Sequence, residues 1–384
     1  MNLALATKLP RVGTTIFTTM SQLAAEHSAV NLGQGFPDFD VPPFLVDALA
    51  YAMREGHNQY APMAGVLALR EAIAEKVAGL YGARVDAGSD ITVTSGATEA
   101  IFCAVHAAVR TGDEVIVLDP CYDSYEPAID LAGARALHVP LVEPDFHVDW
   151  QRVREAITPR TRMLIVNSPN NPTGAVFSAT DLDALAAILR ETRVLLLSDE
   201  VYEHIVFDGV GHQSVLCHPE LAARSFVVSS FGKTYHCTGW KLGYCIAPPA
   251  LSAEFRKVHQ YVTFCSFNPA QHALARMLRE HPEHHLELPA FYQDKRDRFR
   301  ALLADTPFRL LPVAGTYFQL ADYSAISDLD DLAFCRWLTV EKGVAAIPLS
   351  PFLAEPPPGQ RLVRFCFAKS DATQQAAAER LHTL

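Results

Sequence analysis

Short apolar runs that each end at a polar residue constrain the fold of this chain more than any other feature. Five such runs end at Ser95, Asp119, Asn167, Ser198 and Ser229. Most of them are rich in branched residues without strict alternation, which is typical of parallel strands buried on both faces of a sheet. Helical patterns lie between them, and this order predicts an α/β fold with a mostly parallel sheet.

Two of the helical patterns cover residues 98–110 and 181–190, and Ser178 with Asp181 forms a predicted capping box before the second. In sheets of this kind, ligands bind at the carboxyl ends of the strands. We therefore expect the five polar ends to line one crevice.

Length and composition favour a cytoplasmic enzyme with two domains. A chain of 384 residues can bury a large core and divide, and we expect the boundary near residues 281–305, where a charged segment begins. The net charge of -11 argues against nucleic acid as a partner. No apolar run could span a bilayer, and the first residues lack a secretory signal pattern. The eight cysteines are scattered without a Cys-x-x-Cys pair, which is typical of reduced thiols.

Lys233 lies in a Ser/Gly turn directly after the apolar run 226–228. A lysine at the end of a buried strand is poorly solvated, which favours the neutral amine needed for Schiff-base chemistry. A surface lysine in a glycine-rich loop is the alternative, and this segment alone does not distinguish the two. The ending Gly232-Lys233-Thr234 also occurs in P-loops, but Val227 stands where that motif requires glycine, so a nucleotide site is excluded.

Other polar residues at strand ends could bind a ligand. Ser95-Gly-Ala-Thr98 joins a strand to a helix, and its free amides are either an anion site or an ordinary junction. Asn171 lies in a loop with two proline steps and offers an amide. Asp199 needs a partner if it is buried, and Tyr202 is near enough to share its site. Arg364, in a strand-like stretch, is either an exposed-face residue or a clamp for a carboxylate.

Three histidines, His281, His284 and His285, form a small cluster with acidic neighbours. They lack a recognised spacing for metal ligands, so we expect a solvated helix start rather than a metal site.

The chain resembles the class I aminotransferases of fold type I, which use pyridoxal 5'-phosphate. The resemblance runs from end to end, and it is specific because many motifs occur together. Within the class, the chain is most similar to the kynurenine/glutamine transaminase group and to the bacterial methionine aminotransferases. The motifs that carry the resemblance are Leu9-Pro, Gly13-Thr-Thr-Ile-Phe17, Asn31-Leu-Gly-Gln-Gly-Phe-Pro-Asp38, Asn58-Gln-Tyr60, Ser95-Gly-Ala-Thr98, Pro120-Cys-Tyr-Asp123, Asn170-Asn-Pro-Thr-Gly174, Ser198-Asp-Glu-Val-Tyr202, Ser230-Phe-Gly-Lys233, Gly239-Trp-Lys241, Gly343-Val-Ala-Ala-Ile-Pro348 and Arg364-Phe-Cys-Phe367.

This resemblance implies a large domain with a mostly parallel sheet and a smaller α+β domain. Residues 1–43 would form an N-terminal arm and the start of the small domain. Residues 44–289 would form the large cofactor-binding domain, and residues 290–384 would complete the small domain.

The resemblance also implies a role for each cofactor-binding residue. Lys233 would hold pyridoxal 5'-phosphate as an internal aldimine and, once displaced by substrate, would move the proton from Cα. Asp199 would pair with the pyridine nitrogen, which lets the ring accept electrons. Tyr202 and Asn171 would bond the 3' oxygen, and Tyr122 would stack on the ring. The phosphate would be held by Gly96, Ala97, Thr98, Ser230 and Lys241, and by Tyr60 of a second subunit, which implies a homodimer with shared sites.

For substrate, the resemblance implies that Arg364 clamps the α-carboxylate, with Gly35 and Asn171 beside it. The residues expected at the side-chain end of the pocket are apolar or aromatic: Phe17, Tyr125, Phe264 and Cys265. The implied reaction is a ping-pong transfer of the amino group from methionine, or from an aromatic or bulky amino acid, to a 2-oxo acid.

Alternatives on the same scaffold remain. Kynurenine-type relatives carry histidine where this chain has Cys265, so we rank kynurenine below methionine as a donor. No motif position holds the second arginine that would bind the side-chain carboxylate of a dicarboxylic substrate. A β-lyase acting on cysteine S-conjugates would share nearly every residue named above. A cofactor-binding regulator would carry an added DNA-binding segment, and the fold motifs here begin by residue 31.

Overall fold

A seven-stranded sheet with the order β2-β8-β7-β6-β5-β3-β4 is the centre of the larger part of the molecule. The structure is a computed structural model that describes residues 5–384; residues 1–4, the start of the expected arm, lie outside the described residues. In this sheet β8 runs opposite to the other six strands, which are parallel to one another, so the expected α/β fold with a mostly parallel sheet is confirmed. The strands are β2 (Ile91–Thr94), β3 (Glu114–Asp119), β4 (Arg135–Pro140), β5 (Thr161–Asn167), β6 (Leu195–Asp199), β7 (Ser225–Ser230) and β8 (Gly243–Ile246).

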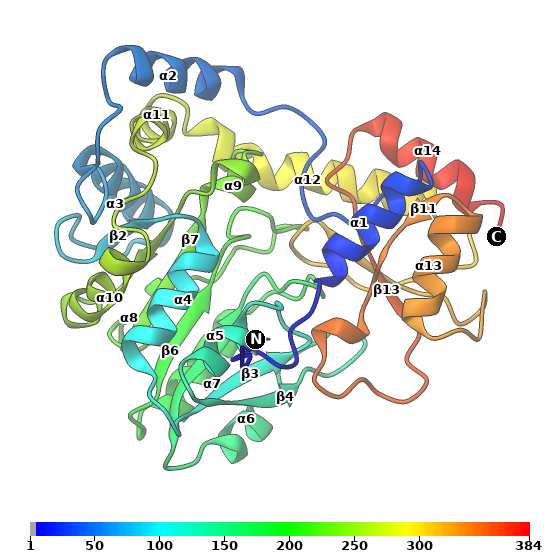
Figure 1. Ribbon diagram of the computed structural model, residues 1–384, viewed down its shortest axis with the longest axis horizontal. Helices are drawn as coiled ribbons and strands as arrows, with labels where there is room; N and C mark the ends of the chain where they lie inside the picture. Colours follow the sequence, from blue (N-terminus) through cyan, green and yellow to red (C-terminus); the bar gives the residue numbers. More distant parts are fainter. Residues whose placement is uncertain (1–4) are drawn as a thin grey trace.

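Helices cover both faces of this sheet (Figure 1), which is why the middle residues of its inner strands are apolar on both faces. In β5, Met163 and Ile165 pack into one hydrophobic cluster, whereas Leu164 and Val166 pack into another on the opposite face. On the first face lie α4 (Ala97–Ala108), α5 (Tyr125–Leu131) and α10 (Pro249–Val262). The opposite cluster includes residues of α2 (Pro43–Arg54), α3 (Leu67–Tyr81), α6 (Trp150–Ala156), α7 (Ala179–Leu189), α8 (Pro219–Ala222), α9 (Phe231–Thr234) and α11 (Asn268–Glu280).

The expected helices over residues 98–110 and 181–190 correspond to α4 and α7. The capping box before α7 is present, because the side chains of Ser178 and Asp181 each accept a hydrogen bond from the other's backbone amide.

The smaller part joins the two ends of the chain. β1 (Val30–Asn31) pairs in parallel with β11 (Val344–Ala345). The segment from α1 (Ile16–Glu26) to β1 therefore packs with residues near the C-terminus. Its four-stranded antiparallel sheet has the order β12-β13-β10-β9. The other elements are β9 (Arg309–Leu310), β10 (Phe318–Asp322), α13 (Asp331–Glu341), β12 (Ile347–Pro348), β13 (Leu362–Cys366) and α14 (Asp371–Leu381).

A long helix, α12 (Glu283–Leu302), runs from the larger part to the smaller one (Figure 1). The expected boundary between residues 289 and 290 falls inside this helix. Within residues 5–384, no helix is both long and apolar enough to cross a membrane.

The sequence predicted a solvated helix start at His281, His284 and His285. These residues do lie near the start of α12, but they are not fully solvated. His285 is only 5 % exposed, and Nε2 of His284 lies 3.0 Å from the Thr234 carbonyl oxygen. His281 and His284 keep partly exposed side chains, and His281 pairs with Glu283 at 2.8 Å. All three histidines pack against the larger part of the molecule, since the His281 ring centre lies 4.1 Å from that of Phe44 and the His285 ring centre lies 5.1 Å from that of His204.

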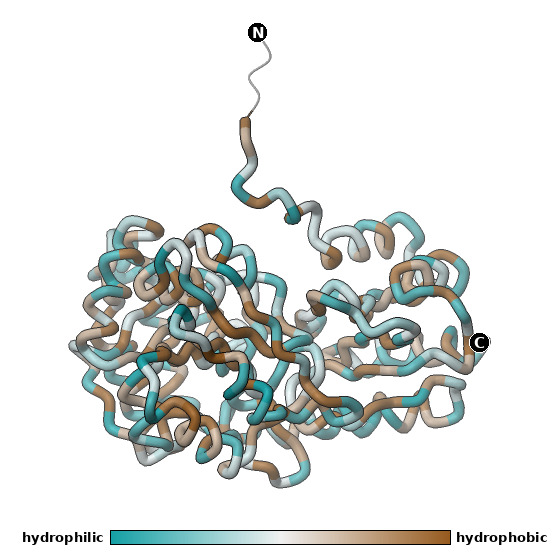
Figure 2. The backbone as a smooth tube through the Cα atoms, turned by 90° about the horizontal axis from the view of Figure 1, so that it is seen from below, coloured by the Kyte–Doolittle hydropathy of each residue, from teal (hydrophilic) through white to brown (hydrophobic). Residues whose placement is uncertain are grey.

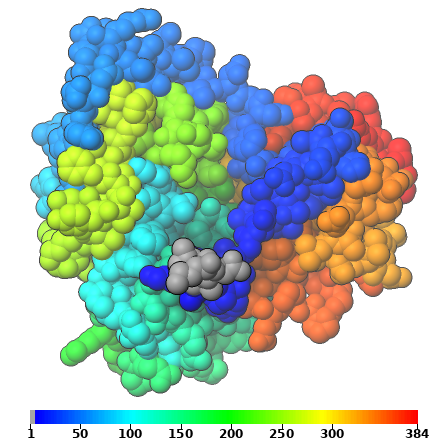
Figure 3. Space-filling model, in the orientation of Figure 1, coloured from blue at the N-terminus to red at the C-terminus, as the bar shows by residue number. Residues whose placement is uncertain are grey.

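The carboxyl ends of β2, β5, β6 and β7 meet at one cavity of about 240 Å³, lined by Gly96, Asn167, Asp199 and Ser230 among others. The end of β3 lies near it, because Tyr122 also lines the cavity although Asp119 does not. Residues of the smaller part close the other side, and the surface in Figure 3 is hollowed between the larger part and α1. Figure 2 shows that the first described residues extend away from the rest of the chain, whereas Arg11 pairs with Glu126 and Asp130 of α5 at 2.9 Å each.

Candidate active site

Lys233 lies on the wall of this cavity, one turn after β7 ends. The Ser230 side chain caps the short helix α9 by accepting a hydrogen bond from the Gly232 amide, which fixes the turn that carries the lysine. Nζ of Lys233 donates to the Gly35 carbonyl at 3.4 Å. Burial lowers the pKa of Lys233 to about 8, and the nearby charge of Arg364 acts in the same direction. The lysine is thereby biased toward its neutral, nucleophilic form.

Asp199, at the end of β6, also faces the cavity. Its Oδ2 accepts a hydrogen bond of 2.6 Å from the Tyr125 hydroxyl, and its Oδ1 accepts one of 3.3 Å from the Val201 amide. Burial raises the pKa of Asp199 to about 6, and the two hydrogen bonds oppose that rise. The carboxylate therefore has the partners that its burial requires.

Tyr125 is not where the resemblance places it. The expectation was a residue at the side-chain end of the substrate pocket, but Tyr125 is 2 % exposed and does not line the cavity. It is the first residue of α5 and packs into the cluster between α4, α5 and the sheet, with its hydroxyl directed at Asp199.

Arg364, on β13, enters the cavity from the smaller part of the molecule. Its Nη1 donates to Oδ1 of Asn171 at 2.7 Å, and its Nη2 donates to the Gly33 carbonyl at 3.1 Å. The guanidinium lies 3.9 Å from the ring centre of Phe318. The side chain is 1 % exposed, so the alternative that Arg364 lies on an exposed face is excluded.

The Nε atom of Arg364 is buried and has no hydrogen-bond partner among residues 5–384. Burial lowers the pKa of Arg364 to about 10, which still leaves it charged near neutral pH. A buried cation with an unused donor beside a cavity is a good site for a carboxylate. Gly35 keeps this region open, because a Cβ there would come within 2.9 Å of the Phe318 ring.

A candidate anion site lines the cavity at the start of α4. Gly96, Ala97 and Thr98 start α4, a helix of 12 residues whose first amides and dipole favour a negative charge. The ammonium group of Lys241 lies beside them, 3.4 Å from where a Cβ at Gly96 would be. Lysine, helix start and the Ser230 side chain together suit a phosphate.

Most residues expected at the site do line this one cavity: Phe17, Gly35, Gly96, Ala97, Thr98, Tyr122, Asn171, Asp199, Tyr202, Ser230, Lys233, Lys241 and Arg364. Tyr60, Phe264 and Cys265 do not. They line a separate surface hollow, where the Tyr60 ring packs edge-on against Phe264 with 5.3 Å between the ring centres. Tyr60 is 83 % exposed, so a single chain does not bring these residues to the cavity.

Sequence reasoning missed the roles of Tyr317 and Asn167. The Tyr317 hydroxyl donates to the Gly35 carbonyl at 2.8 Å, and its ring centre lies 5.8 Å from Nζ of Lys233. The side chain of Asn167 makes two hydrogen bonds. Its Nδ2 donates to the backbone carbonyl of Asp199 at 2.8 Å, and its Oδ1 accepts from the backbone amide of Asn171 at 2.8 Å. Asn167 could have been assigned a role, since it ends one of the apolar runs, whereas Tyr317 has no such signal.

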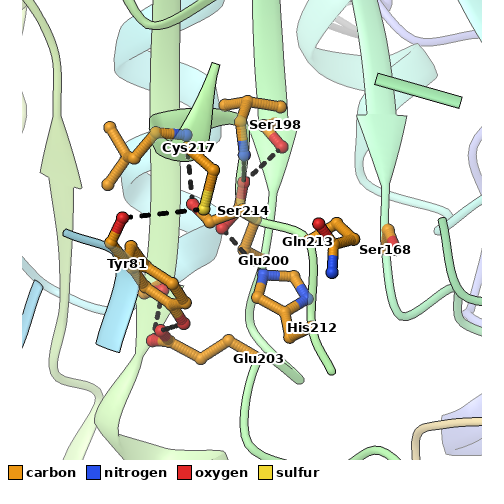
Figure 4. A network of polar contacts seen from close by, with 12 residues as sticks. Tyr81, Ser168, Ser198, Glu200, Glu203, His212, Gln213, Ser214 and Cys217 are labelled. Carbon is orange, nitrogen blue, oxygen red and sulfur yellow. Dashed lines mark hydrogen bonds and ion pairs between the residues drawn. The ribbon is translucent and has the colours of Figure 1, made fainter. Parts of the chain in front are cut away.

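Two further carboxylates hold the segment after β6 (Figure 4). Glu200 accepts hydrogen bonds from the Ser198 hydroxyl at 2.8 Å and the Val215 amide at 3.0 Å, and it lies 3.0 Å from Nε2 of His212. Glu203 pairs with Lys76 at 2.7 Å. Neither glutamate lines the cavity, so both act as anchors of the segment that carries Asp199 and Tyr202.

Comparison with known proteins identifies the family. The family model "Aminotransferase class I and II" matches residues 27–381. The chain is 57 % identical to a methionine aminotransferase of Escherichia coli over 98 % of this chain and 97 % of that protein. It is 35 % identical to kynurenine–oxoglutarate transaminase 1 of Mus musculus, covering 94 % of this chain and 93 % of that protein.

Solved structures agree with this. An Escherichia coli protein with a methionine aminotransferase function superposes with a TM-score of 0.97 at 56 % identity, covering 100 % of both chains. The N-succinyldiaminopimelate aminotransferase of Mycobacterium tuberculosis gives a TM-score of 0.96 at 42 % identity, covering 99 % of this chain and 100 % of that one. The chain therefore belongs to the class I and II aminotransferase family, has its fold type I architecture, and is an aminotransferase.

Proposed function

We propose that this protein is a pyridoxal 5'-phosphate enzyme that transfers the amino group of methionine to a 2-oxo acid. One observation carries the proposal: a lysine of lowered pKa, a buried carboxylate and a buried guanidinium with an unused donor face the same cavity. The 57 % identity to a methionine aminotransferase supports methionine as the donor.

The residues present fit the cofactor in three places. The amine of Lys233 suits its aldehyde, the Asp199 carboxylate suits its pyridine nitrogen, and the start of α4 with Ser230 and Lys241 suits its phosphate. Tyr122 would lie against the ring, while Tyr202 and Asn171 would bond its 3' oxygen. When bound, the cofactor supplies an electron sink for the carbanion formed at the substrate Cα.

The side chains then have distinct tasks. Lys233, once free, takes the proton from the substrate Cα and returns it one carbon away, and its lowered pKa suits both transfers. Asp199 holds a proton on the ring nitrogen by charge and hydrogen bonding. Arg364 offers its Nε and Nη2 groups to the substrate carboxylate, which fixes the Cα–H bond relative to Lys233.

The donor side chain is expected to meet apolar surroundings. Phe17 lines the cavity and lies 5.3 Å from the Arg364 guanidinium, and Phe352 lies 5.2 Å from it. Burial of each methylene there contributes about 0.8 kcal/mol. A second carboxylate would be desolvated without a partner, which disfavours aspartate and glutamate.

The proposal includes a homodimer. The Tyr60 hollow is lined by exposed apolar side chains, with Phe267 51 % and Phe264 44 % exposed. Such a patch suits a partner surface, and a second chain would bring Tyr60 to the phosphate end of the neighbouring cavity. All eight cysteines are unpaired, which fits the reducing conditions of a cytoplasmic location.

The test loads the protein with pyridoxal 5'-phosphate and compares kcat/KM for methionine, phenylalanine, kynurenine and aspartate with one 2-oxo acid. We expect methionine first and aspartate last. Aspartate as the best donor would contradict the proposed pocket, and release of pyruvate from a cysteine S-conjugate without amino transfer would identify a lyase. Borohydride reduction and peptide mapping should label Lys233; a label on Lys241 instead would refute its assignment.

The dimer is tested separately by sedimentation at nanomolar concentration, with activity measured in parallel. A fully active monomer would refute the shared site. Tyr60→Phe should weaken cofactor retention by about 1 kcal/mol, the value of a single hydrogen bond.

A further inference from the structure

Tyr125 and Asp199 form a short hydrogen bond between the wall of the cavity and the core beneath it. The Tyr125 hydroxyl lies 2.6 Å from Oδ2 of Asp199, and both side chains are almost completely buried. Burial, together with the charge of Asp199, raises the pKa of the Tyr125 phenol well above its ordinary value. The phenol therefore stays protonated and acts as the donor in this hydrogen bond.

The other contacts of the Asp199 carboxylate are weaker. Its only further hydrogen bond from a protein donor within residues 5–384 is the 3.3 Å contact between Oδ1 and the Val201 amide. The short bond to Tyr125 therefore fixes Oδ2 in the core, whereas Oδ1, whose one hydrogen bond is long, can also accept from a group in the cavity.

We propose that Tyr125 is a positioning residue, which keeps Asp199 ionised and holds Oδ1 of Asp199 toward the cavity. This role rests on the proposed function in one respect, namely that the group bound by Asp199 is the pyridine N–H of the cofactor. Tyr125 touches neither substrate nor cofactor, because it does not line the cavity.

Other titratable groups also act on Asp199 and must stay constant in a test. Lys233 favours its ionised form from α9, whereas Glu200, the next residue along the chain, disfavours it. Tyr122, Tyr202 and Asp199 also lie close enough for their charges to interact.

The test measures the affinity of pyridoxal 5'-phosphate between pH 5 and pH 9, with Tyr125 or Phe at position 125. Both proteins carry Lys233→Ala, so that covalent attachment does not mask binding to Asp199. In Tyr125→Phe the carboxyl loses its short hydrogen bond and stays protonated to a higher pH. A hydrogen bond to a charged group is worth enough to move the acid limb of affinity upward by about one to two pH units.

Tyr235→Phe is the matched control. Tyr235 is 0 % exposed, and its hydroxyl has no hydrogen-bond partner among the described residues. Removal of this hydroxyl should leave the acid limb of cofactor affinity unchanged. Thermal unfolding of each apoprotein separates a loss of stability from a shift in titration.

With Lys233 intact, Tyr125→Phe should lower kcat by about tenfold or more, while KM for methionine changes by less than about twofold. The reason is that only the ability of Asp199 to keep a proton on the pyridine nitrogen of the cofactor is impaired. An acid limb at the same pH in both proteins would refute the role of Tyr125. Equal shifts in Tyr125→Phe and Tyr235→Phe would also refute it. Failure of the parent protein to bind the cofactor at any pH would instead refute the proposed function.

Discussion

The lowered pKa of Lys233 gives a quantitative prediction for capture of the cofactor. Burial moves this pKa from the ordinary 10.5 to about 8. At pH 7, roughly one lysine in ten would then be neutral, compared with roughly one in three thousand at the ordinary value. Since only the neutral amine attacks an aldehyde, capture at pH 7 should be about 300 times faster than by an unperturbed lysine of equal access and equal intrinsic nucleophilicity.

The assay mixes apoprotein with pyridoxal 5'-phosphate in a stopped-flow spectrometer and follows the visible absorbance from pH 6 to pH 10. The observed rate should rise about tenfold per pH unit and level off near pH 8. Lys233→Ala measures noncovalent binding and the titration of the cofactor itself, which are subtracted. A rate that continues to rise above pH 10 would show that the cavity does not perturb Lys233, and the reasoning from burial would be wrong.

Three further substitutions test other parts of the site and the fold. Asp199→Asn should lower kcat by about a hundredfold or more with a smaller change in cofactor affinity, measured by steady-state kinetics and equilibrium binding; near-normal turnover would place the electron-sink partner elsewhere. Arg364→Lys loses the planar fork and should reduce kcat/KM for methionine by about tenfold to a hundredfold, mainly through KM, and an unchanged KM would exclude the carboxylate clamp. Gly174→Ala should destabilise the apoprotein by about 2–4 kcal/mol in urea unfolding, because its φ is +76° and a Cβ would lie 2.5 Å from Val313. Gly56→Ala, with φ +89° and no atom within 4 Å of the added Cβ, is the control and should cost only about 1–2 kcal/mol; equal losses would contradict the packing argument.

The sequence predicted those parts of the site that depend on strand ends. Asp199 and Lys233 follow runs too apolar to be exposed, and parallel strands end at one edge of a sheet, so the two side chains had to lie close together. β4 was not predicted, because it is an edge strand with exposed ends at Arg135 and Pro140 and because His138 interrupts its apolar run.

Tyr125 was misplaced for a physical reason. Tyr125 is the third residue after Tyr122, and both lie near the start of α5. Which ring faces the cavity depends on where that helix begins. Tyr122 precedes the helix and lines the cavity, whereas Tyr125 is its first residue and turns into the core. Sequence patterns locate helix starts only to within a few residues.

Phe264 does not reach the cavity of its own chain, and the expected contact of Tyr60 with the cavity of a neighbouring subunit stays a prediction. Their ring contact and exposure are visible, but a contribution to a neighbouring cavity depends on a second copy. No periodicity in one sequence encodes the surface that such a copy covers.

The single reversed strand of the large sheet makes one connection sensitive to its length. β7 runs toward the cavity and ends before Lys233, and β8 runs back from it after Lys241, so residues 231–242 leave and return at the same edge. Gly243 lets β8 start there, because a Cβ would lie 2.6 Å from the Ser229 carbonyl and 3.0 Å from the Ala97 amide. An insertion in this connection could leave every strand paired and still separate the two lysines. Loop grafting between relatives should therefore exchange residues 231–242 as one block of fixed length.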